Sequence, residues 1–330
     1  RFSQLSLPLR LSTNRLGVTL VAHGVQLHLA MTPPRQFPPN TTYSITRRCL
    51  LRMFLLLPIP GIREFFTYCL ACAVQRFGVR VHAVCTMSNH FHLVCTDVVG
   101  NMPDCMQWLN CMLARGLNRF HNRSGYFWEA GSYSCVKPID PDDVLDQMVY
   151  TLVNPVAAGL VSRGEDWPGL RSGTLEDGPQ TFHVTKPDLF FDPNNLDLPE
   201  EIDLVVESPE AFERLEKGVS YHEVVEQKEA QIRAEFKETG RSFLGKARVL
   251  NQNPTDTPNT EEPRGRLRPH IACKNKARRI LILAALQQWR QAYRHAFREF
   301  ARGVRDVIFP AGTYKMRVQF GVLCENPEPG

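Results

Sequence analysis

Hydrophobic and polar positions alternate in two neighbouring stretches of the chain, "VRVHAVCT" at 79–86 and "HFHLVCTD" at 90–97. Alternate side chains of a β-strand point to opposite faces, so the pattern predicts two strands joined by a turn at 87–89. In the second strand, His90 and His92 then share one face, while the residue between them points into a core. Such a pair either provides two ligands to a metal ion or consists of polar residues on the solvent-exposed face of a half-exposed strand.

Two further stretches carry the β-branched and aromatic residues that are typical of strands. Residues 41–56, "TTYSITRRCLLRMFLL", predict one or two strands, and residues 126–136, "YFWEAGSYSCV", predict another.

Three other stretches show the residue spacing of amphipathic helices. The first, at 59–78, has Pro60 near its start and Gly78 at its end, and the second covers 102–120. The third begins with Asp140 as a plausible N-cap, followed by a proline at the first helical position. This order of elements predicts an α+β fold, with helices packed against one side of an antiparallel sheet.

Composition divides the chain into four segments. Residues 1–40 end in a proline-rich stretch and predict a flexible extension, with Met31 as the natural start. Residues 41–175 contain the predicted sheet and helices. Residues 176–208 are rich in Asp, Pro and Asn and predict an acidic connector, and residues 209–330 predict a mainly helical accessory region.

The formal net charge of +5 is unevenly distributed. Basic regions at 1–125 and 241–330 flank an acidic region at 126–240. Basic regions collect phosphate, so the asymmetry suggests a polyanionic partner. A solvated surface of mixed sign is the alternative.

The ten cysteines fall mostly on apolar stretches, which indicates small buried side chains in a reducing compartment, and we expect a cytoplasmic protein. Cys69 and Cys72 form a CxxC pair, but no second pair follows at zinc-ribbon spacing, so a buried helix face is the simpler interpretation. No stretch reaches the roughly 18 apolar residues of a membrane span, so no membrane partner is expected.

Candidate chemistry gathers on the third helix, in "MVYTLVNPVAAGLV". Tyr150 and Asn154 are four residues apart and therefore share one helical face. Pro155 removes a backbone donor and predicts a kink or helix end at Asn154. A single tyrosine in such a helix is more often a buried core residue than a catalytic nucleophile.

Three motifs occur in order: "MSNHFHLV", "GYFWEAGSYS" and "YTLVNPVAAGLV". Over residues 41–172 the chain thereby resembles the HUH-class single-tyrosine transposases, in particular the branch associated with repetitive extragenic palindromes. The resemblance implies a ferredoxin-like sandwich at 41–175 that acts as the catalytic domain. It also implies that His90 and His92 are metal ligands, that Tyr150 is the nucleophile and that Asn154 is the third ligand. Ser132 and Ala157 stand where the family usually has basic residues.

The chemistry implied by this resemblance is DNA nicking and strand transfer through a 5′-phosphotyrosine intermediate at palindromic, hairpin DNA. A divalent cation, Mg²⁺ or Mn²⁺, would offset the charge that develops on the phosphate. The substrate would be single-stranded or hairpin DNA, and arginines interleaved with aromatic residues suit such a strand. The predicted DNA-binding residues are Arg115, Arg119, Arg123, Tyr126 and Trp128.

Three alternatives remain open on the sequence. The same fold could bind DNA hairpins as a regulator without cutting them, and Tyr133 is a rival nucleophile by chemistry. Tyr150 could serve the histidines of its own chain or those of a second copy in a homodimer. A hydrolytic zinc enzyme is disfavoured, because "LVCTD" follows His92 without further closely spaced ligands.

Overall fold

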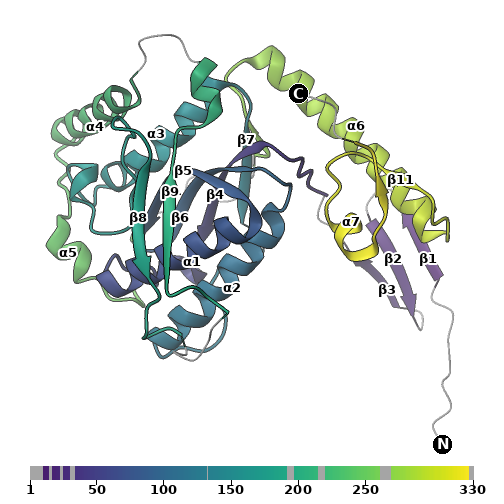
Figure 1. Ribbon diagram of the computed structural model, residues 1–330, viewed down its shortest axis with the longest axis horizontal. Helices are drawn as coiled ribbons and strands as arrows, with labels where there is room; N and C mark the ends of the chain where they lie inside the picture. Colours follow the sequence, from purple (N-terminus) through teal and green to yellow (C-terminus); the bar gives the residue numbers. More distant parts are fainter. Residues whose placement is uncertain are drawn as a thin grey trace, which may run out of the picture. The chain divides into compact units, whose positions relative to one another are not determined.

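The computed structural model describes residues 10–14, 17–22, 25–29, 34–131, 133–191, 197–214, 220–260 and 269–326 (Figure 1). The expected start at Met31, and Ser132, lie outside the described residues. The chain forms two compact units. The larger comprises Phe37–Ala284, and the smaller combines the described residues up to Gln36 with Ala285–Asn326. Within the described ranges, no helix is long and apolar enough to cross a lipid bilayer.

The larger unit is built on a seven-stranded sheet with the order β10-β7-β4-β6-β5-β9-β8. Its strands are β4 (Thr41–Arg48), β5 (Val79–Met87), β6 (His90–Asp97), β7 (Ser134–Pro138), β8 (Gln180–Thr185), β9 (Glu201–Val206) and β10 (Ile271–Ala272). The four central strands, β7 to β5, pair antiparallel. The β10–β7 and β5–β9 pairs are parallel, so the sheet is mixed and not purely antiparallel.

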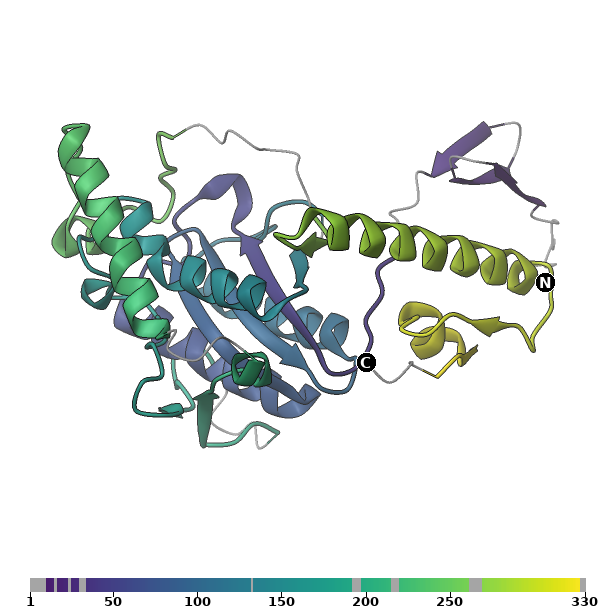
Figure 2. The same cartoon turned by 90° about the horizontal axis from the view of Figure 1, so that it is seen from above.

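Helices pack on both faces of this sheet (Figures 1 and 2). The helices of this unit are α1 (Pro60–Phe77), α2 (Met102–Phe120), α3 (Pro141–Ala157), α4 (Tyr221–Glu238) and α5 (Lys246–Leu250). Phe91 of β6 meets Phe66 of α1, with ring centroids 5.2 Å apart. The next residue of β6, His92, contacts α3 through Asn154. Because neighbouring residues of a strand face opposite sides, α1 and α3 lie on opposite faces.

The α+β class is confirmed, but the expectation that helices cover one side only is wrong. The second face of the sheet carries buried apolar side chains from β5 and β6, and these need a cover. The apolar side of α3 supplies it, in a cluster that includes Cys85, Val94, Met148 and Leu152. The order β4–α1–β5–β6–α2–β7, with β7, β4, β6 and β5 side by side, is the ferredoxin-like arrangement.

Local sequence signals fix the ends of the predicted helices. Pro60 is the first residue of α1, and Gly78 ends it in the left-handed conformation at φ 66°. Asp140 and Asp143 form a capping box at the start of α3. Before α2, the buried carboxylate of Asp97 accepts hydrogen bonds from four successive backbone N–H groups at residues 99–102. The N–H groups at the starts of α2 and α3 are thus satisfied by nearby carboxylates, whereas α1 begins at a proline, which has no N–H group.

Several boundaries differ from the sequence-based expectation. Residues 41–56 form only β4 and a 3-10 turn, η1 (Leu50–Arg52), and 126–136 form a strand only from Ser134 onward. The segment expected to be a connector contributes β8 and β9. In β9, the inward residues Ile202, Leu204 and Val206 are buried. Apolar residues alternate along this acidic segment, and its two strands extend the sheet beyond β5.

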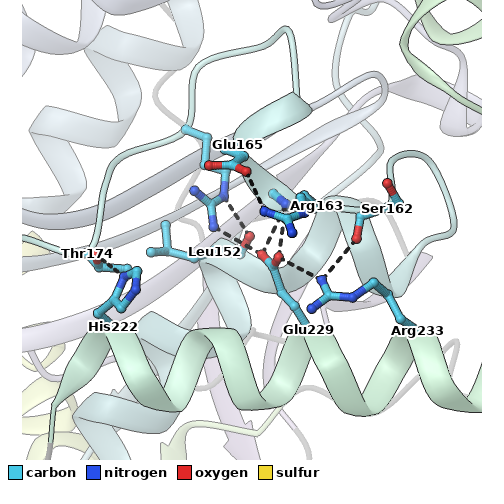
Figure 3. Close-up of polar contacts among 10 residues, drawn as sticks. Leu152, Ser162, Arg163, Glu165, Thr174, His222, Glu229 and Arg233 are labelled. Carbon is cyan, nitrogen blue, oxygen red and sulfur yellow. Dashed lines mark hydrogen bonds and ion pairs between the residues drawn. The ribbon is translucent and has the colours of Figure 1, made fainter.

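Helix α4 is held against α3 by a buried polar network (Figure 3). Both carboxylate oxygens of Glu229 accept a hydrogen bond from the backbone N–H of Gly164, at 3.1 Å each. Arg171 and Arg233 form ion pairs with the same carboxylate at 3.3 and 3.6 Å. The Nε of Arg171 also donates to the carbonyl of Leu152 in α3. Glu229 thereby ties α4 to the helix that carries Tyr150.

The CxxC pair lies in α1, with both side chains buried. Burial raises the pKa of the Cys69 and Cys72 thiols, as expected for an apolar helix face.

The smaller unit has its own elements. An antiparallel sheet joins β1 (Arg10–Asn14), β2 (Gly17–Ala22) and β3 (Val25–Leu29), in the segment expected to be a flexible extension. Helix α6 (Lys276–Ala301) continues from the larger unit into this one, and α7 (Lys315–Phe320) follows between β11 (Ile308–Phe309) and β12 (Leu323–Cys324). Trp289, Tyr293 and Phe309 lie in its apolar core. The C-terminal region is thus mainly helical, as expected.

Candidate active site

His90 and His92 lie on the face of β6 that is covered by α3. Their ring centroids are 4.8 Å apart, and the rings are nearly perpendicular at 84°. His92 is buried at 4% exposure, and His90 is half-buried. The hairpin turn at Ser88 and Asn89 sets this register, because it fixes which residues of β6 face each side.

Helix α3 brings Tyr150 and Asn154 to the same place. The rings of His92 and Tyr150 are 5.2 Å apart between centroids and meet edge to face at 87°. The amide Nδ2 of Asn154 lies 3.2 Å from Nε2 of His92. The four residues singled out on the sequence therefore come together within one chain, on one strand and one helix.

Tyr150 and Asn154 differ in their access to solvent. Tyr150 is 53% exposed, whereas Asn154 is 9% exposed. Of the eight tyrosines in the chain, only Tyr126 and Tyr150 are exposed. The phenol of Tyr150 thus stands at the rim of the site, where a large substrate can reach it.

The helix does not end at Asn154, contrary to the expectation from Pro155. It continues through the proline to Ala157. The side chain of Asn154 also donates to the carbonyl of Tyr150, one turn earlier, at 3.4 Å. The buried packing of α3 against the sheet outweighs the cost of a proline inside the helix.

Hydrogen bonds orient both imidazole rings in the same way. Nδ1 of His90 lies 2.6 Å from the carbonyl oxygen Oδ1 of Asn89, which can only accept, so the ring donates from Nδ1. Nε2 of His92 accepts from Asn154, so its Nδ1 donates to Thr46 Oγ1 at 3.0 Å. Each ring thus carries its lone pair on Nε2, the atom that a metal would take.

The electrostatic surroundings keep both rings neutral. Burial, with a smaller contribution from the positive charge of Arg48, lowers the pKa of His92 to about 3. Burial also lowers the pKa of His90 well below its usual range, with His92, Arg48 and Arg52 adding to the effect. Neutral imidazole is the form that binds metal, so neither ring has to lose a proton first at neutral pH.

The side chains of His90, His92 and Asn154 offer ligand atoms that suit a divalent cation. The Asn154 side chain contacts Nε2 of His92, and the ring of His90 lies beside that of His92. Turning the amide of Asn154 over would exchange its nitrogen for its oxygen. Two nitrogen ligands and one oxygen ligand leave coordination positions open for a substrate.

A second group of side chains could hold a metal. One ligand atom each from Asp140, Asp143 and Cys273 lie within 4.8 Å of one another at the start of α3. Their oxygens already have partners: Asp143 accepts from the backbone N–H of Asp140 and of Lys274, and Asp140 pairs with Arg278. Nothing identifies a metal for this group, and it lies at the opposite end of α3 from Asn154.

The predicted DNA-binding residues are not gathered around the histidines. Arg115 and Arg119 are exposed on α2, which packs with α1 against the other face of the sheet, and they line a cavity of about 450 Å³. Arg123 follows α2 and is half-buried, and Tyr126 is 83% exposed. Trp128 is buried at 8% exposure, with its Nε1 donating to the Asn110 carbonyl. A role in DNA binding stays a prediction for all five.

Sequence reasoning missed four residues that surround the two histidines. Strand β4 pairs antiparallel with β6, so that Thr46 lies opposite His92 and Arg48 opposite His90. Asn89 holds the ring of His90, and its own Nδ2 donates to the carbonyl of Arg52. The alternation in "ITRR" at 45–48 puts Thr46 and Arg48 on one face of a strand. It indicates that they lie beside the histidines only once the pairing of β4 with β6 is known.

No family model matches the chain, and no curated protein matches it. Among solved structures, the chain is similar to a REP-associated tyrosine transposase bound to a REP hairpin, with a TM-score of 0.36 and 15% identity over 42% of this chain and 81% of that one. It is also similar to a "putative transposase" from Deinococcus radiodurans R1, with a TM-score of 0.26 and 18% identity over 32% of this chain and 85% of that one. Both likenesses are distant.

Proposed function

We propose that this protein nicks and rejoins single-stranded or hairpin DNA, with Tyr150 as the nucleophile and His90, His92 and Asn154 as the ligands of a divalent cation. The observation that carries the proposal is the meeting of Tyr150 and Asn154 with His92, at 5.2 Å between ring centroids and 3.2 Å between Nδ2 and Nε2. A core tyrosine would be buried, whereas Tyr150 is half exposed beside two neutral imidazoles.

The reaction is a transesterification that conserves the number of phosphoester bonds. The Oη of Tyr150 attacks the phosphorus of a phosphodiester, and a bond forms between them. The bond from phosphorus to the 3′ oxygen breaks, which leaves a 5′-phosphotyrosine and a free 3′-OH. The phenol proton leaves to solvent at the exposed rim, and the leaving oxygen takes up a proton. Attack by a 3′-OH on the phosphotyrosine reverses the step and joins strands.

A divalent cation supplies charge neutralisation at the phosphate when it is bound. The residues of the chain prepare that site in advance. Asn89 orients the ring of His90, and Thr46 and Asn154 orient that of His92, so that both Nε2 atoms carry lone pairs, and burial keeps both rings unprotonated. Magnesium is the more abundant ion in cells, whereas Mn²⁺ suits imidazole ligands better and should support activity in vitro.

The substrate strand is expected to be single at the reacting phosphate. Tyr150 projects from the body of α3, so its phenol reaches only a phosphate that can approach the helix closely. An unpaired strand next to a hairpin meets this requirement, and we therefore propose palindromic DNA as the substrate class.

Incubation of the protein with a labelled hairpin oligonucleotide and Mn²⁺ tests the proposal. The expected product is a covalent protein–DNA adduct that survives denaturing electrophoresis and is absent with Tyr150→Phe. Tyr126→Phe is the matched control: it removes only the hydroxyl of the other exposed tyrosine and keeps the aromatic ring that is predicted to contact DNA, so the adduct should still form.

Two results would contradict the proposal in different ways. An adduct that persists with Tyr150→Phe would move the nucleophile elsewhere, with Tyr133 as the first candidate. Tight hairpin binding without any adduct, with several hairpins and with Mg²⁺ or Mn²⁺, would favour the non-cleaving regulator.

A further inference from the structure

Arg48 shares the face of the sheet that carries His90 and His92. In the antiparallel pair of β4 and β6, Arg48 is the direct partner of His90, and Thr46 is the partner of His92. Directly paired residues have Cβ atoms about 5 Å apart on one face. The hydrogen bond between Thr46 and His92 shows this geometry two residues away.

The turn after Arg48 is fixed to the same histidine. Leu51 and Arg52 both adopt left-handed backbone angles, at φ 52° and 60°, which is uncommon for residues other than glycine. The carbonyl of Arg52 accepts from Asn89 Nδ2, and the same amide holds His90 through its oxygen. The guanidinium of Arg52 is anchored by two hydrogen bonds to Thr260. Arg52 is thus anchored near His90, and Arg48 lies directly opposite His90 in the strand pair.

Within the part of the chain that the structure describes, the polar groups that hydrogen-bond to the two rings carry no negative charge. Their hydrogen-bond partners are Asn89, Thr46 and Asn154, all of them neutral. The charged groups that influence the rings are Arg48 and Arg52, both positive. A cation that entered this site alone would meet neutral ligands and two like charges, whereas an anion would be attracted.

We propose that this site takes its divalent cation and a phosphodiester together, with Arg48 as the residue that holds the anionic phosphate. The inference rests on the proposed function, because it specifies how the same site is filled. The bound phosphate supplies the negative charge that the protein ligands lack, so each partner raises the affinity for the other. Thermodynamic linkage requires this coupling to be the same in both directions.

The coupling can be measured by titrating Mn²⁺ into the full-length Tyr150→Phe protein and following free Mn²⁺ by electron paramagnetic resonance. The titration is run with and without a single-stranded oligonucleotide, and the Tyr150→Phe background prevents cleavage. Additional replacement of His92 by Gln corrects for Mn²⁺ that is bound by the DNA itself. We expect the oligonucleotide to tighten Mn²⁺ binding at the protein site at least tenfold.

Arg48→Gln, in the same background, should change the two measurements in opposite directions. Without DNA, Mn²⁺ binding should tighten severalfold because a like charge is gone. With DNA, the tightening by the oligonucleotide should fall towards onefold. A side chain with only a structural role would weaken both.

Arg47→Gln is the matched control. It removes the same charge from the neighbouring residue, whose side chain faces the other way, donates to the Gly131 carbonyl and lies over the ring of Trp128. It should leave the coupling intact, and circular dichroism should show both variants folded.

The inference is overturned if Mn²⁺ binds equally tightly with and without the oligonucleotide, or if Arg47→Gln and Arg48→Gln act alike. Its failure is distinguishable from failure of the proposed function. Coupled binding without any covalent adduct would support this inference and count against cleavage. An adduct without coupled binding would do the reverse.

Discussion

Replacing Arg171 by methionine should destabilise the larger unit, because it removes the nearest cation from a buried carboxylate. The side chain of Glu229 is 2% exposed and that of Arg171 13%, so both charges lie largely out of water. Methionine fills most of the volume of arginine and cannot carry its charge. The contact that Arg171 makes to the Leu152 carbonyl of α3 is lost as well.

Breaking one half of a buried ion pair costs about 3–5 kcal/mol. Two partners of Glu229 remain in the variant: the Gly164 N–H and the more distant guanidinium of Arg233. They offset part of the loss, so we expect a fall in the free energy of unfolding of about 2–3 kcal/mol.

The loss should depend on pH in a defined direction. Burial raises the pKa of Glu229, and the charge of Arg171 counters that rise. In Arg171→Met the pKa of Glu229 therefore rises further. A carboxyl whose pKa is raised by folding stabilises the protein fully below its unfolded pKa of about 4.3, and this is lost as pH rises through the folded pKa. The deficit of the variant should thus be small near pH 4 and largest above pH 7.

Urea unfolding followed by tryptophan fluorescence measures this loss, since Trp167 lies in the apolar cluster between α3 and α4. The double variant Arg171→Met/Glu229→Gln should be more stable than Arg171→Met alone, because the unpaired charge is gone. Arg163→Met is the control, because the ion pair of Arg163 with Glu165 is exposed to solvent and its loss should leave stability nearly unchanged. A deficit below about 0.5 kcal/mol, or one independent of pH, would refute the reasoning.

Three other substitutions or conditions give measurable outcomes. Asp97→Asn should lower the free energy of unfolding by about 2–3 kcal/mol in urea, since the buried carboxylate accepts four N–H groups at the start of α2. Gly116→Ala should lower the free energy of unfolding by about 1–3 kcal/mol in the same assay, because the added Cβ would lie 2.3 Å from the ring of Phe65. The control, Gly61→Ala, has open space around it and should be neutral or slightly stabilising. The stability of the metal-free protein should fall as pH drops below about 6.5, because the unfolded chain then binds a proton at His92 that the folded protein, with a His92 pKa of about 3, does not. His92→Gln should reduce the slope of stability against pH by up to about 1.4 kcal/mol per pH unit, measured by thermal melts at several pH values.

Much of the larger unit could be predicted because local signals there agree with the packing. The alternating pattern of β6 placed His90 and His92 on one face. The start of α1 follows from Pro60, and the start of α3 follows from its N-cap residue, Asp140. The meeting of α3 with β6 could be expected only from the resemblance to a known family, because contacts between distant segments have no local signal.

Other features could not be predicted because tertiary contacts decide them. Pro155 predicted a helix end, but the packing of α3 on the sheet carries the helix through it. The acidic composition of 176–208 concealed the alternation that lets β9 pair with β5. The arginines at 115 and 119 sit in a plausible DNA-binding pattern, yet α2 presents them on the sheet face opposite His92. Arg48 became a candidate only when pairing placed it opposite His90.

Mass spectrometry of the covalent DNA adduct tests the central claim most directly. After the protein has reacted with a hairpin oligonucleotide and Mn²⁺, nuclease and protease digestion leaves a nucleotide on the attacking residue. We expect that nucleotide on the peptide that contains Tyr150, attached through its 5′ phosphate. A nucleotide on Tyr126 or Tyr133, or an unmodified Tyr150 in a reaction that has cut the DNA, would contradict the assignment.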